Sequence, residues 1–195
     1  MSYSSRRTKG QKILVYLRDT KYFAMKYKEY FSPVKLTVYV DSSFANGSNR
    51  KGIYGFVIYL NEQVLHYKSK LQPLVSQSST EAEFVVMALT IKEVKWILQM
   101  LEELQVLVEA SLLFCDNQGA IKIVQNRSAT ARSKHIDIKL QSMKDAVLQS
   151  VIKVRYVQSS DNVADLFTKP LGRLQFYKLR ASLLCIDEHK NKGGC

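Results

Sequence analysis

The stretch SLLFCDNQGA, residues 111–120, ends an apolar strand on a carboxylate. Residues 112–115 are apolar, as in a buried strand, whereas Asn117 and Gln118 follow as the start of a turn and a helix. A carboxylate is costly to remove from water unless a partner compensates its charge. Asp116 therefore either caps the following helix or contributes to a metal site.

Three more strands precede this stretch. KLTVYVD, residues 35–41, alternates apolar and polar side chains, which is the pattern of a strand with one buried face. GIYGFVIYL, residues 52–60, and QVLHYKSK, residues 63–70, are two further strands. Only Asn61 and Glu62 separate them, so we expect a tight antiparallel hairpin.

A long helix from Thr80 to about Leu104 is predicted by apolar residues that recur at three- and four-residue steps. Its start matches a capping box in two registers, with Ser78 and Glu81 or with Thr80 and Glu83. We expect Trp96, on this helix, to lie in the core.

Downstream of Asp116 the pattern alternates between helices and one more strand. The expected elements are a short helix at 117–126, a polar loop at 127–133, a helix at 134–149, a strand at 150–157, a helix beginning in 161–169 and an amphipathic helix in 172–186. This order predicts an α/β protein with a mixed five-stranded sheet. Three antiparallel strands would be followed by two parallel strands, with helices on both faces, and strands 35–41 and 111–115 would be neighbours.

Several acids fall at one edge of this predicted sheet. Asp41 and Asp116 lie at the carboxyl ends of neighbouring strands, which is where α/β proteins bind ligands. Glu81 and Glu83 lie at the start of the long helix, and Asp165 at the start of the helix after the last strand. The spacing leaves both glutamates open as members of the group.

Clustered carboxylates repel one another, and divalent cations relieve that repulsion. Oxygen ligands suit Mg²⁺ or Mn²⁺, and two such ions can activate water and stabilise the leaving oxygen of a phosphodiester. Each acid also has a simpler explanation, as a turn residue, a helix cap or a first-turn acid. Their placement at one edge of the sheet favours the metal site.

The composition is that of a globular, basic protein. Among its 195 residues, 29 are Lys or Arg and 17 are Asp or Glu, which gives a net charge of +12. Such a charge indicates a nucleic-acid or other polyanionic partner. The three cysteines lack the paired spacing of a zinc site, and no apolar run reaches the roughly 20 residues of a membrane helix. We therefore expect neither zinc nor a membrane.

Six motifs resemble the RNase H domain of copia-type LTR retrotransposon Pol polyproteins. They are VYVDSSFA, NRKGIYGFVIYL, SKLQPLVSQSSTEAEF, LFCDNQGAIKI, RSKHIDIK and VQSSDNVADLFTKPL, in family order. ILVYLRDTKYFAMKY also resembles the end of the reverse-transcriptase region that precedes this domain. The resemblance implies a basic reverse-transcriptase end at 1–34, an RNase H-like domain at 35–171, and a C-terminal helix with a flexible tail at 172–195.

The resemblance implies an endoribonuclease that cleaves the RNA strand of RNA–DNA hybrids during reverse transcription. Asp41, Glu83, Asp116 and Asp165 match the four catalytic acids, which hold two Mg²⁺ or Mn²⁺ ions. Glu83 is chosen over Glu81 because the family's glutamate is followed by an aromatic residue or leucine. The expected partners are the hybrid and the reverse-transcriptase part of the same polyprotein.

The sequence departs from related domains at two points. Ser43 replaces an acid that many members carry, and the loop after the last strand lacks the histidine of cellular RNases H. His135 either substitutes for that histidine or serves the fold. The candidate contacts to substrate are Ser42, Ser43, Asn117, Gln118, Arg132 and His135.

Two other functions stay open at this point. One is an inactive or domesticated RNase H-like remnant that only binds nucleic acid. The other is an integrase- or transposase-type nuclease, which the order Asp, Glu, Asp, Asp disfavours because those enzymes place the glutamate last. The resemblance implies a cytoplasmic location in virus-like particles, with the nucleus as the alternative because of the basic N-terminal cluster.

Overall fold

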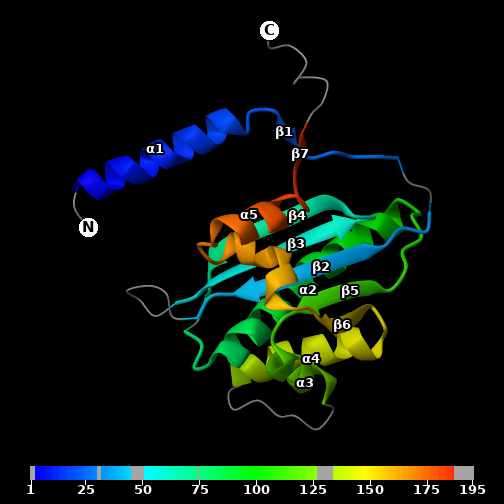
Figure 1. Cartoon of the computed structure of the whole chain (residues 1–195). Coiled ribbons are helices and arrows are strands. Elements are labelled where there is room, and N and C mark those ends of the chain that lie inside the picture. Colours follow the sequence, from blue (N-terminus) through cyan, green and yellow to red (C-terminus); the bar gives the residue numbers. More distant parts are fainter. Residues whose placement is uncertain (1–2, 30–31, 45–50, 74, 127–133, 187–195) are drawn as a thin grey trace.

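The computed structural model describes residues 3–29, 32–44, 51–73, 75–126 and 134–186, with the side chains of 3–9 and 134–140 left out. A five-stranded sheet of strand order β4-β3-β2-β5-β6 forms its centre (Figure 1). The strands are β2 (Leu36–Ser42), β3 (Ile53–Leu60), β4 (Gln63–Leu71), β5 (Ser111–Cys115) and β6 (Ile152–Tyr156).

The strand directions agree with the sequence pattern. β2 pairs antiparallel with β3 and parallel with β5, and β5 pairs parallel with β6. The predicted tight hairpin is also present, because β3 pairs antiparallel with β4. Asn61 and Glu62, which connect the two strands, both have positive φ, at 47° and 68°. The predicted mixed sheet is confirmed. The predicted contact between the strand that carries Asp41 and the strand that ends before Asp116 is confirmed as well.

One face of the sheet is covered by three helices, α2 (Ser79–Glu103), α3 (Gln118–Gln125) and α4 (Lys134–Leu148). The apolar stripe of α2 is buried against β2 and contributes more residues to the main core than any other element. The expectation for Trp96 was wrong, because its side chain is 61% exposed. Trp96 lies two residues after buried Val94, and two residues carry a helix about half a turn to its opposite side.

The other face carries residues from the C-terminal part of the chain. The 3₁₀ segment η2 (Val163–Phe167) packs on β2 and β3, and α5 (Arg173–Arg180) packs on η2. Leu179 of α5 is buried in this second apolar cluster with Val57 and Tyr59. Helical segments therefore lie on both faces of the sheet, as predicted.

The expected α-helix in 161–169 is instead two 3₁₀ segments, η1 (Ser159–Asp161) and η2. Asn162 separates them because its backbone is extended and its buried amide is used for tertiary contacts. Its Nδ2 donates to the carbonyl of Val40 at 2.9 Å, and its Oδ1 accepts from the backbone N–H of Ala164 at 3.2 Å. These bonds fix η2, and with it Asp165, against the end of β2.

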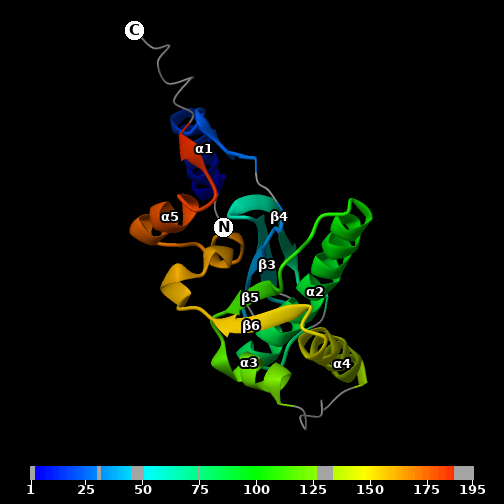
Figure 2. The same cartoon turned by 90° about the vertical axis from the view of Figure 1, so that its right-hand side faces the viewer.

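The N-terminal segment folds beside the C-terminal one. Helix α1 (Tyr3–Asp19) leads to β1 (Phe23–Ala24), which pairs with β7 (Cys185–Ile186). The Arg180 guanidinium lies 4.3 Å from the centre of the Phe23 ring and 5.7 Å from that of Tyr16. Figure 1 shows β1 and β7 side by side, away from the five-stranded sheet, and Figure 2 shows α1 on the same side of the molecule.

The residue limits predicted for the functional segments, 1–34, 35–171 and 172–195, stay predictions. Residues 187–195 and the predicted loop at 127–133 lie outside the described residues. Among the helices that the structure describes, none combines the length and the apolar character needed to cross a membrane.

Replacing Gly55 by alanine should destabilise the protein by about 1–3 kcal/mol, because the new methyl group overpacks the site. A Cβ at Gly55 would lie 2.6 Å from the Cβ of Phe167 and 2.9 Å from the Cγ2 of Thr168. Urea unfolding measures the change. Gly10→Ala is the matched control, since nothing lies within 4 Å of its added carbon and alanine favours the helix. A Gly55→Ala variant as stable as the parent would contradict this packing.

Candidate active site

The four predicted acids come from four different elements and meet at one end of the sheet. Asp41 lies in β2, Glu83 in the first part of α2, Asp116 directly after β5 and Asp165 in η2. One carboxylate oxygen from each of Asp41, Asp116 and Asp165 lies within 4.8 Å of the others. Glu83 joins through Asp116, since oxygens of these two acids and the Sγ of Cys115 also lie within 4.8 Å.

Asp41 is fully buried and its two carboxylate oxygens are both bonded. The Thr168 hydroxyl donates to Oδ2, and the Lys169 ammonium lies 2.9 Å from Oδ1. Both donors follow η2 directly, so the segment that places Asp165 also binds Asp41. Gly55, which pairs with Asp41 across the sheet, leaves the room that Thr168 occupies.

Glu83 is held by the two strands that carry its neighbours. Its Oε1 accepts from the backbone N–H of Ser42 at 2.8 Å and from the Ser42 hydroxyl at 2.9 Å. The Cys115 thiol donates to Oε2 at 3.7 Å. Burial, and then the charges of Asp41 and Asp116, raise the pKa of Glu83 to about 8, against the lowering effect of the Ser42 bonds. Without a cation, Glu83 is therefore largely protonated at neutral pH.

Asp165 and Asp116 differ in their exposure to water. Asp165 is buried, and this burial, together with the charge of Asp41, raises its pKa to about 6 although Lys169 acts in the opposite direction. The carboxylate of Asp116 is only partly buried, and the Ser159 hydroxyl donates to it at 2.6 Å. Asp116 thus forms the side of the cluster that water or a substrate can reach.

Glu81, the alternative glutamate, serves the start of α2. Ser78 is the N-cap, and its Oγ accepts from the backbone N–H of Glu81 at 3.1 Å. The Glu81 carboxylate turns back to the backbone N–H of Gln77 at 2.9 Å. The structure therefore places Glu83, and not Glu81, beside Asp116.

Three of the residues suggested for substrate binding already have partners within the fold. Ser42 binds Glu83, as described above, and the Ser43 hydroxyl accepts from the backbone N–H of Ile53 at 3.0 Å. Asn117 caps α3, since its Oδ1 accepts from the backbone N–H of Ala120 at 2.9 Å. These bonds position the loops that flank the acids.

The other suggested residues are less constrained or not described. Gln118 is exposed at the start of α3, near Asp116. Arg132 and the side chain of His135 lie outside the described residues. Contact of all six residues with a substrate stays a prediction.

Sequence reasoning missed Lys169 and Thr168. Lys169 lies 2.9 Å from Asp41 and 3.0 Å from Asp165 and is the cation that pairs with these acids in the described structure. The four-residue spacing between Asp165 and Lys169 was a usable signal for one of these ion pairs. The contacts to Asp41 span 127 and 128 residues, and no local pattern indicates them.

The donor set fits a hard divalent cation. Carboxylate oxygens are the ligands that Mg²⁺ and Mn²⁺ prefer, and among the described residues Lys169 supplies a single positive charge for four acids. Burial raises the pKa of the Cys115 thiol, so this sulfur stays neutral. A neutral thiol is a poor metal ligand, so Cys115 does not make the site selective for a soft metal. Asp41, Glu83, Asp116 and Asp165 are the residues that could hold such ions.

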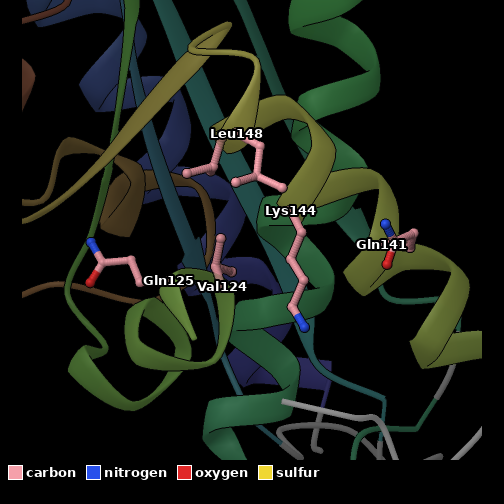
Figure 3. Close-up of a pocket in the computed structure, with 6 residues that line it drawn as sticks. Val124, Gln125, Gln141, Lys144 and Leu148 are labelled. Atoms are coloured by element: carbon pink, nitrogen blue, oxygen red, sulfur yellow. The ribbon is translucent and has the colours of Figure 1, made fainter. Parts of the chain in front are cut away.

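A separate cavity of about 520 Å³ lies between α3 and α4 (Figure 3). It is lined by Val124, Gln125, Gln141, Lys144, Val147 and Leu148. None of the four acids borders this cavity, so it is distinct from the carboxylate cluster.

The chain is similar to known transposon proteins. It is 33% identical over 139 residues to the retrovirus-related Pol polyprotein from transposon TNT 1-94 of Nicotiana tabacum, a match that covers 71% of this chain and 10% of that protein. For the Pol polyproteins of transposons RE1 and RE2 of Arabidopsis thaliana, identity is 31% and 30%, with 89% and 94% of this chain and 12% and 13% of those proteins covered. The chain thus spans about a tenth of the length of these relatives.

The fold is similar to that of a solved ribonuclease. LC11-RNase H1, isolated from compost by a metagenomic approach, superposes with a TM-score of 0.53 over 69% of this chain and 92% of that one, at 14% identity. No protein-family model matches the chain.

The metal-free protein should become less stable as the pH rises from about 5 to 8. The pKa of Glu83 is about 8 when folded and ordinarily 4.5, so over this range the folded state keeps a proton that the unfolded chain has lost. That contribution disappears as the pH passes about 8, and its size is on the order of a few kcal/mol. Thermal unfolding in EDTA across this range measures it.

Glu83→Gln should flatten this pH slope, because the side chain can no longer ionise. Glu81→Gln is the matched control, since it changes the same residue type two positions away and should keep the slope. A Glu83→Gln variant with the parental slope would contradict the described environment of Glu83.

Proposed function

This chain is homologous to one segment of the retrovirus-related Pol polyproteins of transposons, and from that premise we propose that it is a metal-dependent ribonuclease H. The reaction would be endonucleolytic cleavage of the RNA strand of an RNA–DNA hybrid. The observation that carries the proposal is the convergence of Asp41, Glu83, Asp116 and Asp165, from four separate elements, on an RNase H fold.

The arrangement of the acids supports hydrolysis without a protein nucleophile. Asp41, Asp116 and Asp165 would hold one Mg²⁺ or Mn²⁺ ion, and Glu83 with Asp116 would hold a second. When bound, two such ions would activate a water molecule and neutralise the charge on the leaving oxygen of a phosphodiester. Ser42 orients Glu83, and Ser159 orients Asp116 at the accessible side of the cluster.

The charge of the chain supports a nucleic-acid substrate. The net charge of +12 attracts a phosphate backbone, while the cluster itself is acidic and needs cations before a phosphate can approach. A duplex that contains RNA is recognised through its backbone and 2′-hydroxyl groups more than through its base edges. An RNA–DNA hybrid fits these requirements.

The reverse-transcriptase part of the same polyprotein is the proposed partner. The chain covers only 10–13% of the length of its plant relatives. In addition, α1 exposes a run of apolar side chains, with Leu14 at 67%, Ile13 at 60% and Leu17 at 56%. Contiguous exposed apolar surface of this kind usually marks a contact with another protein surface.

Glu83→Gln should reduce the rate of hybrid cleavage to the background rate measured without protein, because it removes a charged ligand from the cluster. Glu81→Gln should lose about 1 kcal/mol of stability through its cap contact and retain cleavage below its melting temperature. The measurement is a cleavage time course with labelled hybrid and Mg²⁺, accompanied by a melting curve for each variant. If Glu83→Gln cleaved the hybrid at the parental rate, Glu83 would not be part of the active site.

Among nucleic acids, the protein should cut RNA in a hybrid and leave single-stranded RNA, double-stranded DNA and the DNA strand of the hybrid largely intact. The four substrates are compared at equal concentration with Mg²⁺, Mn²⁺ or EDTA, and EDTA should stop all cleavage. Equal cleavage of double-stranded DNA would favour the integrase or transposase class. Binding of hybrid without any cleavage would favour the inactive remnant.

A further inference from the structure

Lys169 links two of the four acids. Its Nζ lies 2.9 Å from Asp41 Oδ1 and 3.0 Å from Asp165 Oδ1. The two carboxylates are almost completely buried, with 0% and 5% of their side chains exposed, whereas the Lys169 side chain is 33% exposed. The ammonium group therefore lies at the boundary between the buried acids and water.

The two carboxylates that Lys169 binds belong to the group of acids that could hold a cation. Oxygens of Asp41 and Asp165 lie within 4.8 Å of one another and of an Asp116 oxygen. An ammonium bonded to these carboxylates and a divalent ion coordinated by the same carboxylates would repel each other at very short range. The two positive groups are thus competitors for Asp41 and Asp165.

We propose that Lys169 is a positioning residue that occupies the Asp41–Asp165 pair until a divalent cation replaces it. Lys169 then controls how tightly the site binds metal, a role that rests on the proposed function. Before the exchange, the ammonium keeps the two acids together and limits their repulsion. On exchange it withdraws to the solvent side, where it is already one-third exposed.

The neighbouring residues allow Lys169 to leave without loss of the acid geometry. Asp41 keeps its bond from the Thr168 hydroxyl, and η2 keeps its attachment to β2 through Asn162. The backbone N–H of Lys169 also remains bonded to the carbonyl of Asp165 at 3.1 Å. Only the side chain of Lys169 has to move.

The test is the affinity for Mn²⁺, measured by titration calorimetry on the full chain without nucleic acid. Lys169→Met should bind Mn²⁺ at least about fivefold more tightly than the parent, because a competing charge is gone. Its metal-free melting temperature should fall, and saturating Mn²⁺ should restore it. A residue that only supported the fold would lower the melting temperature and leave the affinity unchanged.

Lys178→Met is the matched control. It removes the same charge and an ion pair, but Lys178 pairs with Asp161, and both side chains are about half exposed. Its Mn²⁺ affinity should change less than twofold, since solvent screens exposed charges. Lys169→Gln repeats the test with a polar side chain if Lys169→Met does not fold.

The outcomes separate this inference from the proposed function. If the parent protein binds Mn²⁺ and cuts hybrid, but the Lys169 variants bind Mn²⁺ equally or more weakly, only the role of Lys169 is overturned. A parent chain that binds no Mn²⁺ overturns the metal-dependent function, and the inference falls with it.

Discussion

Four carboxylates occupy one small region of this protein, and their mutual repulsion is the constraint that its surroundings satisfy. Three of them, Asp41, Glu83 and Asp165, lose nearly all contact with water. The repulsion is limited by hydrogen bonds from Ser42, by the ion pairs of Lys169 and by the proton that Glu83 retains. These compensations hold the acids together in the absence of metal, and a divalent cation would take over part of this role.

The fold is what brings these acids together, because no two of them come from the same element. The parallel pairing of β2 with β5 places Asp41 near Asp116, and the start of α2 lies beside both strands. Residues 162–169 then close the site from the opposite face through Asn162, Thr168 and Lys169. A cluster assembled in this way depends on the whole sheet, so a change on the neighbouring strand β3, such as one at Gly55, is expected to affect it.

Much of this architecture could be predicted from the sequence, because the strands and the long helix have strong local patterns. The contact between β2 and β5 followed from the rule for crossover helices, and with it the expected meeting of Asp41 and Asp116. Features that depend on tertiary contacts could not be predicted in this way. The amide of Asn162 bonds to Val40, 122 residues away, and so turns an expected α-helix into two 3₁₀ segments. Lys169 is 128 residues from Asp41 in the sequence, and no sequence periodicity predicts an ion pair over that separation.

The central claim is that the four acids form one centre for divalent cations, and anomalous diffraction from crystals grown with MnCl₂ tests it most directly. The account predicts Mn²⁺ peaks bounded by oxygens of Asp41, Asp116 and Asp165 and by oxygens of Glu83 and Asp116. The Lys169 ammonium should be displaced from Asp41 in the same crystals. Crystals saturated with Mn²⁺ that show no peak at these oxygens, or peaks only elsewhere on the surface, would contradict it.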